Sequence, residues 1–344
     1  MRQSTIGTWA VGITSVCLVV AALFIAIAAG VAIGEMTIPM KTTITAVTNR
    51  LGFTTIALPR IQEAVIWDYR LSRSLAAAFC GAGLALSGAI LQSLLRNPLA
   101  EPYVLGISAG ASTGAVSVML LGFGAGAISL SAGAFIGALL AFAFVVLLSS
   151  GPQTADRTIL AGVAASQLFN ALTSYIVSTS ANAEQARSVM FWLLGSFAGV
   201  RWPEVSLAAS VVVVGLVVCI WHSRALDAFT FGEDAARSLG IAVQRVRVVL
   251  LLVTALMTAT MVSMVGAIGF VGLVIPHAAR FIVGPGHMRL LPVCALVGAL
   301  FMVVADIVSR VIIAPQVLPI GVVTALVGVP FFSVILYRAR RIAA

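Results

Sequence analysis

Charged side chains are scarce in this chain: 9% of its 344 residues are charged, while 61% are hydrophobic. A soluble domain carries roughly 25% charged residues, so burial in a soluble core does not account for this composition. A helix needs about 20 apolar residues to cross ~30 Å of hydrocarbon. The length therefore accommodates about ten spans in one all-α, multi-pass transmembrane domain, residues 1–344, with no room for a sizeable soluble domain.

Lysine is rarer still, because Lys41 is the only one. A phosphate-binding loop requires G-x-x-x-x-G-K-[ST], whereas Lys41 follows Met40. The sequence therefore predicts no nucleotide site and no catalytic residues in this chain, and ATP would be hydrolysed by another polypeptide. The formal net charge of +9 comes almost entirely from arginines spread between apolar runs. That distribution indicates membrane topology rather than binding of nucleic acid.

Cysteine and histidine are too few and too dispersed to predict a metal site. The four cysteines lie singly inside apolar runs, without paired spacing, and we interpret them as packing residues. The histidines, His222, His277 and His287, all fall on the side that we assign as inner. We expect His277 to make a structural hydrogen bond, and no histidine is placed to bind haem iron in the outer half.

The apolar runs predict the positions of the spans. Gly34–Tyr69, the longest polar stretch, is expected outside, and His222–Arg247 forms the main inner segment. More basic residues lie on the side that holds both termini, which places both termini in the cytoplasm. The expected spans are about Val11–Ile33, Leu71–Leu95, Val104–Leu121, Ala127–Ser149, Thr158–Thr179, Glu204–Trp221, Val248–Val265, the residues after Gly272 to Val283, Leu290–Ile312, and the residues after Gly321 to Leu336.

Small residues are dense in the second and third expected spans. Such residues let helix backbones approach closely in a membrane, so we expect tight helix packing there. The glycines concerned are Gly81, Gly83 and Gly88 in the second span and Gly106, Gly110 and Gly114 in the third.

The joint between these two spans is richer in polar and backbone-restricting residues than its surroundings. Pro98 and Pro102 remove backbone donors and push Asn97 and Glu101 away from helical geometry. Asn97 and Glu101 can bond backbone groups that lipid would leave unpaired. The joint is either a plain helix–loop–helix connection or a constriction in a pathway.

Five motifs, in order, give the chain a resemblance that covers residues from about Arg70 to the C-terminus. They resemble the permease subunits of ABC importers for cobalamin, haem and ferric siderophores, the FecCD-type family. The motifs are SGAILQSLLRNPLAEPYVLGISAGA (Ser87–Ala111), MFWLLGS (Met190–Ser196), GAIGFVGLVIPHAAR (Gly266–Arg280), ADIVSR (Ala305–Arg310) and LPIGVVTALVGVPFF (Leu318–Phe332).

The resemblance implies an assembly in a bacterial inner membrane that works by alternating access. Two copies of the permease would form the pore as a homodimer, with two cytoplasmic ATPase subunits and a periplasmic substrate-binding protein. It assigns residues to three roles. The docking residues for the binding protein would be Arg70, Arg73 and Arg310, which would face outward. The cytoplasmic gate would consist of Asn97, Leu99, Thr154 and Ala155. The ATPase would contact segment 223–247 through Glu233, Ala235, Arg237, Leu239 and Gly240, with Gly240 as the bend between two short helices.

The cargo would be haem, a ferric siderophore or cobalamin, with no cofactor bound permanently. Tyr175, Arg187 and Met190 are the candidates for contacting it near the outer mouth. We lean towards haem because a guanidinium can pair with propionate groups. Arg187 could equally be a helix-end or docking arginine.

Simpler readings and rival functions stay open at this point. The outer arginines could be interface anchors, and segment 223–247 a solvated amphipathic loop. An ion-coupled secondary transporter would require an acidic residue inside the membrane, for which Asp306 is the candidate. A non-transporting membrane scaffold would need neither the charged inner segment nor the outer arginines.

Overall fold

The computed structural model describes residues 2–34, 36, 38–124, 126–149 and 155–343, and within these ranges the regular structure is helical. The helices follow the chain as α1 (Arg2–Ala32), α2 (Met40–Arg50), α3 (Arg60–Ala64), the π-helical turn η1 (Val65–Leu71), α4 (Ser72–Leu94), the 3-10 turn η2 (Pro102–Leu105), α5 (Ile107–Leu121), α6 (Leu130–Leu148), α7 (Ala155–Ser180), α8 (Ala183–Leu193), α9 (Trp202–Trp221), α10 (Ser223–Phe229), α11 (Glu233–Ser238), α12 (Val243–Val265), α13 (Val271–Val283), α14 (His287–Val311) and α15 (Ile320–Ala343).

Ten helical segments match the ten expected spans. Among the described residues, six helices are long and apolar enough to cross a membrane. Four shorter apolar stretches complete the set: Val16–Ala32, Ile107–Leu121, Val271–Val283 and Ile320–Val334. The all-α fold and the approximate span positions are therefore as the sequence predicts.

One boundary differs from expectation, and one further helix is present. The second span begins well before Leu71, because α3, η1 and α4 form one continuous helix from Arg60 to Leu94. The polar stretch Gly34–Tyr69 thus contains the short helix α2 and the start of this long helix. The segment after α7 contains a further helix, α8, whose first turn is fixed by Asn182: its side chain accepts the Gln185 amide proton at 2.8 Å.

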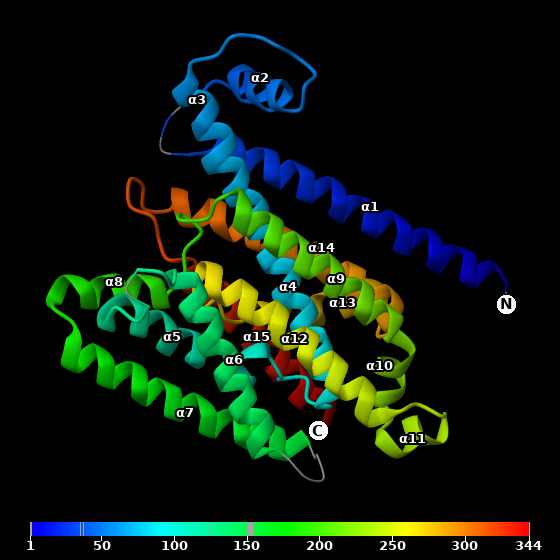
Figure 1. Cartoon of the computed structure of the whole chain (residues 1–344). Coiled ribbons are helices and arrows are strands. Elements are labelled where there is room, and N and C mark those ends of the chain that lie inside the picture. Colours follow the sequence, from blue (N-terminus) through cyan, green and yellow to red (C-terminus); the bar gives the residue numbers. More distant parts are fainter. Residues whose placement is uncertain (1, 35, 37, 125, 150–154, 344) are drawn as a thin grey trace.

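Helix α4 is the centre of the molecule and packs among α9, α12, α13 and α14 (Figure 1). Its glycines explain how the backbones come so close. A Cβ on Gly81 would lie 2.1 Å from the Gly298 carbonyl oxygen on α14, and one on Gly88 would lie 1.9 Å from the Gly272 carbonyl oxygen on α13. Both positions therefore exclude any larger residue, which confirms the tight packing expected from the glycine pattern.

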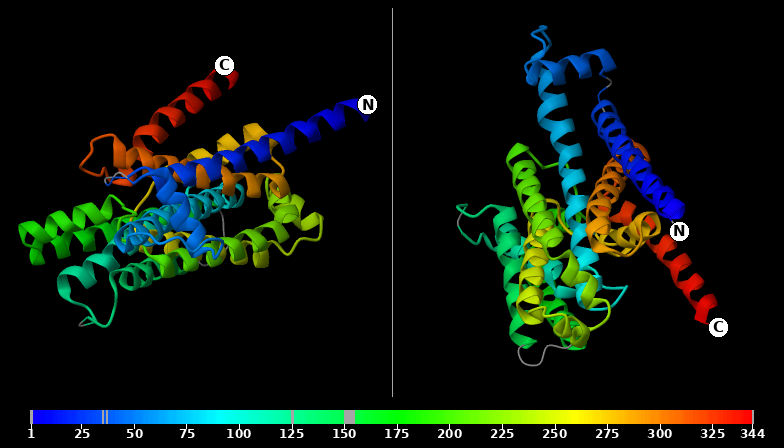
Figure 2. Two further views of the ribbon diagram at one scale, coloured as in Figure 1. Left: turned by 90° about the horizontal axis from the view of Figure 1, so that it is seen from above. Right: turned by 90° about the vertical axis from the view of Figure 1, so that its right-hand side faces the viewer.

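Helices α5 and α6 form a second close pair. A Cβ on Gly110 would lie 2.3 Å from the Gly137 carbonyl oxygen. The two views in Figure 2 show α15 running away from the rest of the helices, while α1 lies along one side of the bundle. Several apolar side chains of α15, including Leu326 and Val334, are consequently exposed.

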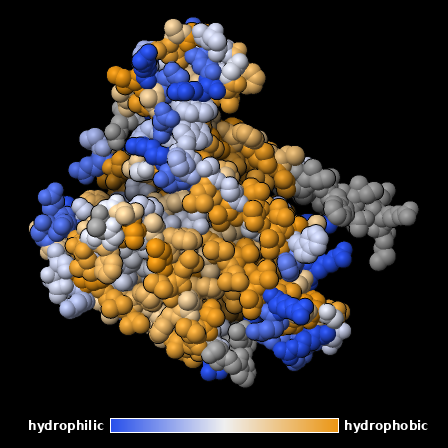
Figure 3. All heavy atoms as spheres, in the orientation of Figure 1, coloured by the Kyte–Doolittle hydropathy of each residue, from blue (hydrophilic) through white to orange (hydrophobic). Residues whose placement is uncertain are grey.

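The surface is apolar across the middle and polar towards both ends. Figure 3 shows an orange face over the central helices, with blue residues gathered over α2 and α3 at the top and over α11 at the lower right. This is the distribution that a bilayer imposes on a spanning protein. It places α2 and α3 on one side of the membrane and α10 and α11 on the other.

Candidate functional site

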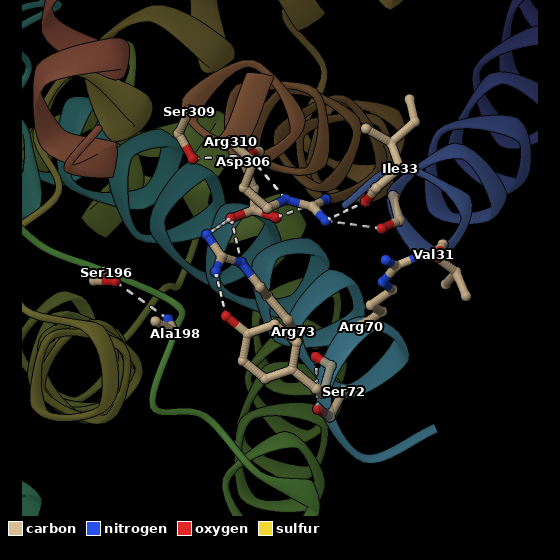
Figure 4. Close-up of polar contacts among 12 residues, drawn as sticks. Val31, Ile33, Arg70, Ser72, Arg73, Ser196, Ala198, Asp306, Ser309 and Arg310 are labelled. Carbon is tan, nitrogen blue, oxygen red and sulfur yellow. Dashed lines mark hydrogen bonds and ion pairs between the residues drawn. The ribbon is translucent and has the colours of Figure 1, made fainter. Parts of the chain in front are cut away.

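Two buried arginines on different helices share one carboxylate near the α2 and α3 side of the bundle. Arg73 on α4 donates from Nε to Asp306 Oδ1 at 2.9 Å, and its Nη2 lies 2.8 Å from the same oxygen. Arg310 Nη2 lies 3.2 Å from Asp306 Oδ2. The three side chains point toward one another in Figure 4. This cluster joins α4 to α14 through charge-assisted contacts.

Arg310 and a further buried arginine, Arg70, cap the carboxyl end of α1. Arg310 Nη1 donates to the carbonyl oxygens of Gly30 and Ile33 at 3.0 and 2.7 Å. Arg70 Nη1 donates to the carbonyl oxygens of Val31 and Ala32 at 3.2 and 3.0 Å. The last carbonyls of a helix lack partners within the helix, and cations favour that end. These contacts fix α1 to η1 and α14.

The expected outward exposure of the three docking arginines is wrong in this structure. The relative exposure of Arg70, Arg73 and Arg310 is 2%, 2% and 8%. The reason is that these arginines point inward, to Asp306 and to the carbonyl groups at the end of α1. Asp306, the residue that an ion-coupled transporter would require, is itself only 1% exposed and held between two cations.

The joint after α4 is an ordered turn on the other side of the molecule. Arg96 adopts a left-handed conformation with φ 48°, and Asn97 Oδ1 accepts the Leu99 amide proton at 2.9 Å. Burial raises the pKa of the Glu101 carboxyl group. The expectation that Asn97 bonds a backbone group is confirmed, and the same expectation for Glu101 stays a prediction. Leu99 is 45% exposed.

The other two predicted gate residues, Thr154 and Ala155, lie at the edge of the described residues. Thr154 lies outside the described residues, and Ala155 is the first residue of α7, with no description of its side chain. The pairing of Asn97 and Leu99 with Thr154 and Ala155 therefore stays a prediction.

The segment expected to couple to an ATPase folds as two short helices, α10 and α11. The bend between them lies at Gly232, which has φ 108°, and not at Gly240 as expected. Gly240, with φ 79°, ends α11 instead. A Gly at the end of a short helix and a Gly between two helices give the same sequence pattern, which is why the sequence misplaces the bend.

Charge pairs hold α11 against the start of α12. Glu233 contacts Arg237 at 3.1 Å and also pairs with Arg247 of α12. Phe231 and Leu239 remain 80% and 72% exposed at the two ends of α11. Ala235 is half-buried on the same helix. The segment thus presents two large apolar side chains from a rigid support, which a solvated loop would not need.

The three pathway candidates lie on the exposed side of α7 and α8. Tyr175 on α7 is 67% exposed, and Met190 on α8 is 63% exposed. Arg187, one turn before Met190, is also exposed. The structure therefore leaves all three accessible, on two consecutive helices.

A polar stripe on α7 accompanies these residues, and the sequence analysis missed it. Gln167, Asn170 and Ser174 are exposed and spaced by three and four residues, so they share one helix face. Gln167 and Asn170 line a hollow of about 280 Å³ together with Val104. The signal was present in the sequence as a helical spacing of amides and hydroxyls inside an apolar run.

His277 behaves as expected: its Nδ1 lies 2.8 Å from the Leu273 carbonyl oxygen of its own helix. His287 has a partner at each ring nitrogen: Ser93 Oγ lies 2.6 Å from Nε2, and Asp227 Oδ1 lies 2.6 Å from Nδ1.

Comparison with known proteins gives a consistent result along nearly the whole chain. The model of the FecCD transport family matches residues 20–338. The cobalamin import system permease protein BtuC of Halobacterium salinarum is 41% identical over 289 residues, covering 83% of this chain and 77% of the relative. The vitamin B12 import system permease protein BtuC of Escherichia coli is 41% identical over 282 residues, covering 81% and 85%.

The fold is similar to that of a solved transporter. A structure described as an inward-facing conformation of a metal-chelate type ABC transporter superimposes with a TM-score of 0.81 at 31% identity. The match covers 93% of this chain and 97% of that one.

Proposed function

The chain belongs to the FecCD transport family, as a permease subunit of a type II ABC importer, and from this premise we propose that its cargo is a corrinoid of the vitamin B12 class. The relatives reported above are named for cobalamin or vitamin B12, and none is named for haem. The earlier leaning towards haem rests on Arg187 alone.

The observation that carries this proposal is the polar stripe of α7. Exposed amide and hydroxyl groups on a spanning helix are unfavourable towards lipid, so they face water or a second protein surface. Gln167, Asn170 and Ser174 are uncharged. Neutral hydrogen-bonding groups suit a corrin ring, whose rim carries amide side chains, and they suit dicarboxylate cargo less well. We therefore place the pathway along α7, between two copies of the chain.

Haem remains the second candidate because of one specific observation. Arg187 and Met190 are both exposed and three residues apart on α8, so a cation and an apolar side chain share a face near the end of the stripe. A guanidinium could hold a propionate of haem, or an acidic group of a ferric siderophore.

The partners follow from the family and from the two polar ends of the bundle. The importer would contain a second copy of this chain, two ATPase subunits and a substrate-binding protein, with both termini in the cytoplasm. Phe231 and Leu239 would enter the ATPase from α10 and α11. The binding protein would dock on the α2 side, where Arg70, Arg73 and Arg310 act by holding the helix ends in place.

A competition assay tests the cargo. The permease, its ATPase and its binding protein are reconstituted in proteoliposomes, and ATP-driven uptake of labelled cobalamin is measured against excess haem or ferric siderophore. We expect only cobalamin itself to compete. Uptake of haem with no uptake of cobalamin would contradict the proposal.

A further inference from the structure

A chain of hydrogen bonds joins three helices on the α10 side of the bundle. Ser93 Oγ, in the last turn of α4, lies 2.6 Å from His287 Nε2, at the start of α14. His287 Nδ1 lies 2.6 Å from Asp227 Oδ1 on α10. Ser93 and His287 are buried, with relative exposures of 5% and 2%. We propose that this chain transmits movement of α10 to the joint that follows α4.

The proposal rests on the proposed role of segment 223–247 as the ATPase contact, and it adds the route by which that contact reaches the gate. The protons fit a directional chain. In the neutral imidazole one ring nitrogen donates and the other accepts. With Nδ1–H donating to Asp227, Nε2 accepts the hydroxyl proton of Ser93 at 2.6 Å, and the Ala89 carbonyl oxygen at 3.1 Å is the competing acceptor for that one proton.

Asp227 attaches to α14 at two points, which makes the link stiff. Its Oδ1 also accepts the backbone N–H of His287 at 2.9 Å. A carboxylate at the N-terminal end of α14 accepts from an amide that has no partner within that helix, and the dipole of α14 favours a negative charge there. Because two donors of one residue hold the same oxygen, α10 cannot tilt relative to α14 without breaking a charge-assisted contact.

From Ser93 the chain continues directly into the gate joint. The Arg96 and Asn97 amides donate to the carbonyl oxygens of Ser93 and Gln92 at 3.4 and 3.2 Å. Asn97 in turn holds the Leu99 amide at 2.9 Å. A displacement of the last turn of α4 is therefore passed to Asn97 and Leu99 through consecutive bonds.

The joint lies close to the bend of the coupling segment, and α4 is also bonded to α13 next to that joint. A Cβ on Gly232, at the bend between α10 and α11, would lie 3.7 Å from Arg96 Nη1. Gln92 accepts from Arg280 Nη1 at 2.6 Å and donates to the Gly272 carbonyl oxygen at 3.2 Å, which fastens α4 to α13. The last turn of α4 thus moves together with α13 and α14.

The alternative is a purely structural connection between packed helices. Polar chains in a buried site cost desolvation that apolar packing avoids, so a chain of this kind contributes specificity of arrangement more than stability. A structural connection and a transmitting one differ in a measurable quantity, namely the number of cargo molecules moved per ATP hydrolysed.

The test measures that ratio in the reconstituted importer for Ser93→Ala, Ser93→Thr, Asp227→Asn and the double variant Ser93→Ala with Asp227→Asn. Energetic coupling carried by such a network corresponds to roughly a three- to tenfold change. We expect Ser93→Ala and Asp227→Asn each to lower the ratio by that factor, and Ser93→Thr, which keeps the hydroxyl, to restore most of it. The double variant should fall no further than either single one, because both break the same chain.

Ser112→Ala is the matched control. It removes a buried hydroxyl whose partner among the described residues lies within α5, the Ser108 carbonyl oxygen at 2.9 Å. Its ratio should equal that of the unmodified protein. An unchanged ratio in Ser93→Ala and Asp227→Asn, with both assembled, would overturn the proposal.

A second measurement separates this proposal from the one on which it rests. Leu239→Cys is labelled with a photo-crosslinker and tested for capture of the ATPase subunit. If capture fails, the coupling segment is misassigned and the transmission proposal falls with it. If capture succeeds and the ratios stay unchanged, the transmission proposal alone is wrong.

Discussion

The Nε of Arg73 donates to Asp306 Oδ1 at 2.9 Å, and both side chains are almost completely buried, although they are 233 residues apart in the chain. This pair joins the first turn of α4 to α14, and Asp306 also contacts Arg310, which caps the end of α1. Residues that the family pattern assigns to docking are thus part of the internal framework of the fold.

The first prediction concerns the stability of that framework. Asp306→Asn should lower the free energy of unfolding by about 3–5 kcal/mol, because it leaves two buried cations without their counter-charge. Thermal unfolding of the purified protein in detergent measures the change. Arg60→Ala, an exposed arginine on the same side, is the control and should stay within about 0.5 kcal/mol. Equal unfolding curves for Asp306→Asn and the unmodified chain would show that the pair is not structural.

Because Arg73 is buried, we expect it to affect docking of the binding protein only through the stability of the fold. Arg73→Glu should reduce binding of the substrate-binding protein only to the extent that it reduces the folded fraction. Binding is measured at low and high salt, because exposed charge pairs are screened within about 8 Å near physiological salt. A salt-sensitive loss of affinity in a fully folded variant would instead restore direct docking.

The coupling surface gives a prediction about assembly. Phe231→Asp and Leu239→Asp should each weaken co-purification with the ATPase while leaving the fold intact, because both side chains are largely exposed. A contact that contributes about 1.4 kcal/mol corresponds to about tenfold in affinity. Phe123→Asp, on an exposed loop after α5, is the control. Equal recovery of the ATPase with all variants would remove the assignment.

Arg187 discriminates between the cargo candidates. If a corrinoid is carried, Arg187→Ala should change uptake by less than twofold. If an anionic chelate is carried, the Arg187→Ala variant should lose a charge-assisted bond of roughly 1.5–3 kcal/mol, and uptake should fall about tenfold or more. Arg187→Lys should then recover only part of the loss, since lysine keeps the charge without the planar fork. Docking affinity recorded in parallel identifies the remaining possibility, a docking arginine.

Glu101 provides a pH dependence. Burial raises the pKa of its carboxyl group in the folded state, so the neutral form is favoured there. Its contribution to stability is complete below the pKa of the unfolded chain and is lost as the pH rises through the higher folded pKa. Glu101→Gln keeps the size of the side chain but cannot ionise. The melting temperature of the variant relative to the unmodified chain should therefore rise from acidic to neutral pH, and a constant difference would contradict this.

The sequence predicted the helices well and the contacts between them poorly, for physical reasons. Long apolar runs and their polar breaks determine where a chain crosses a membrane, so the span from Val248 to Val265 is found within α12. Glycine spacing predicted the close approach that Gly88 and Gly272 make.

Side-chain partners depend on which distant helices meet, and no local pattern encodes that. Arg73 and Asp306 are an example, because each residue alone is equally compatible with an exposed site. Ser93, His287 and Asp227 are another, since their spacing in the chain has no period. The α7 stripe differs from both: its spacing was readable in the sequence, and only its exposure required the structure.

ATP-driven uptake of labelled cobalamin into proteoliposomes is the most direct test of the central claim. The liposomes contain this permease, its ATPase and its binding protein, with ATP supplied on the ATPase side. The account predicts accumulation that requires hydrolysable ATP and the binding protein, and that is unaffected by collapsing proton and sodium gradients. Accumulation driven by an ion gradient without ATP, or import of haem with no import of cobalamin, would contradict it.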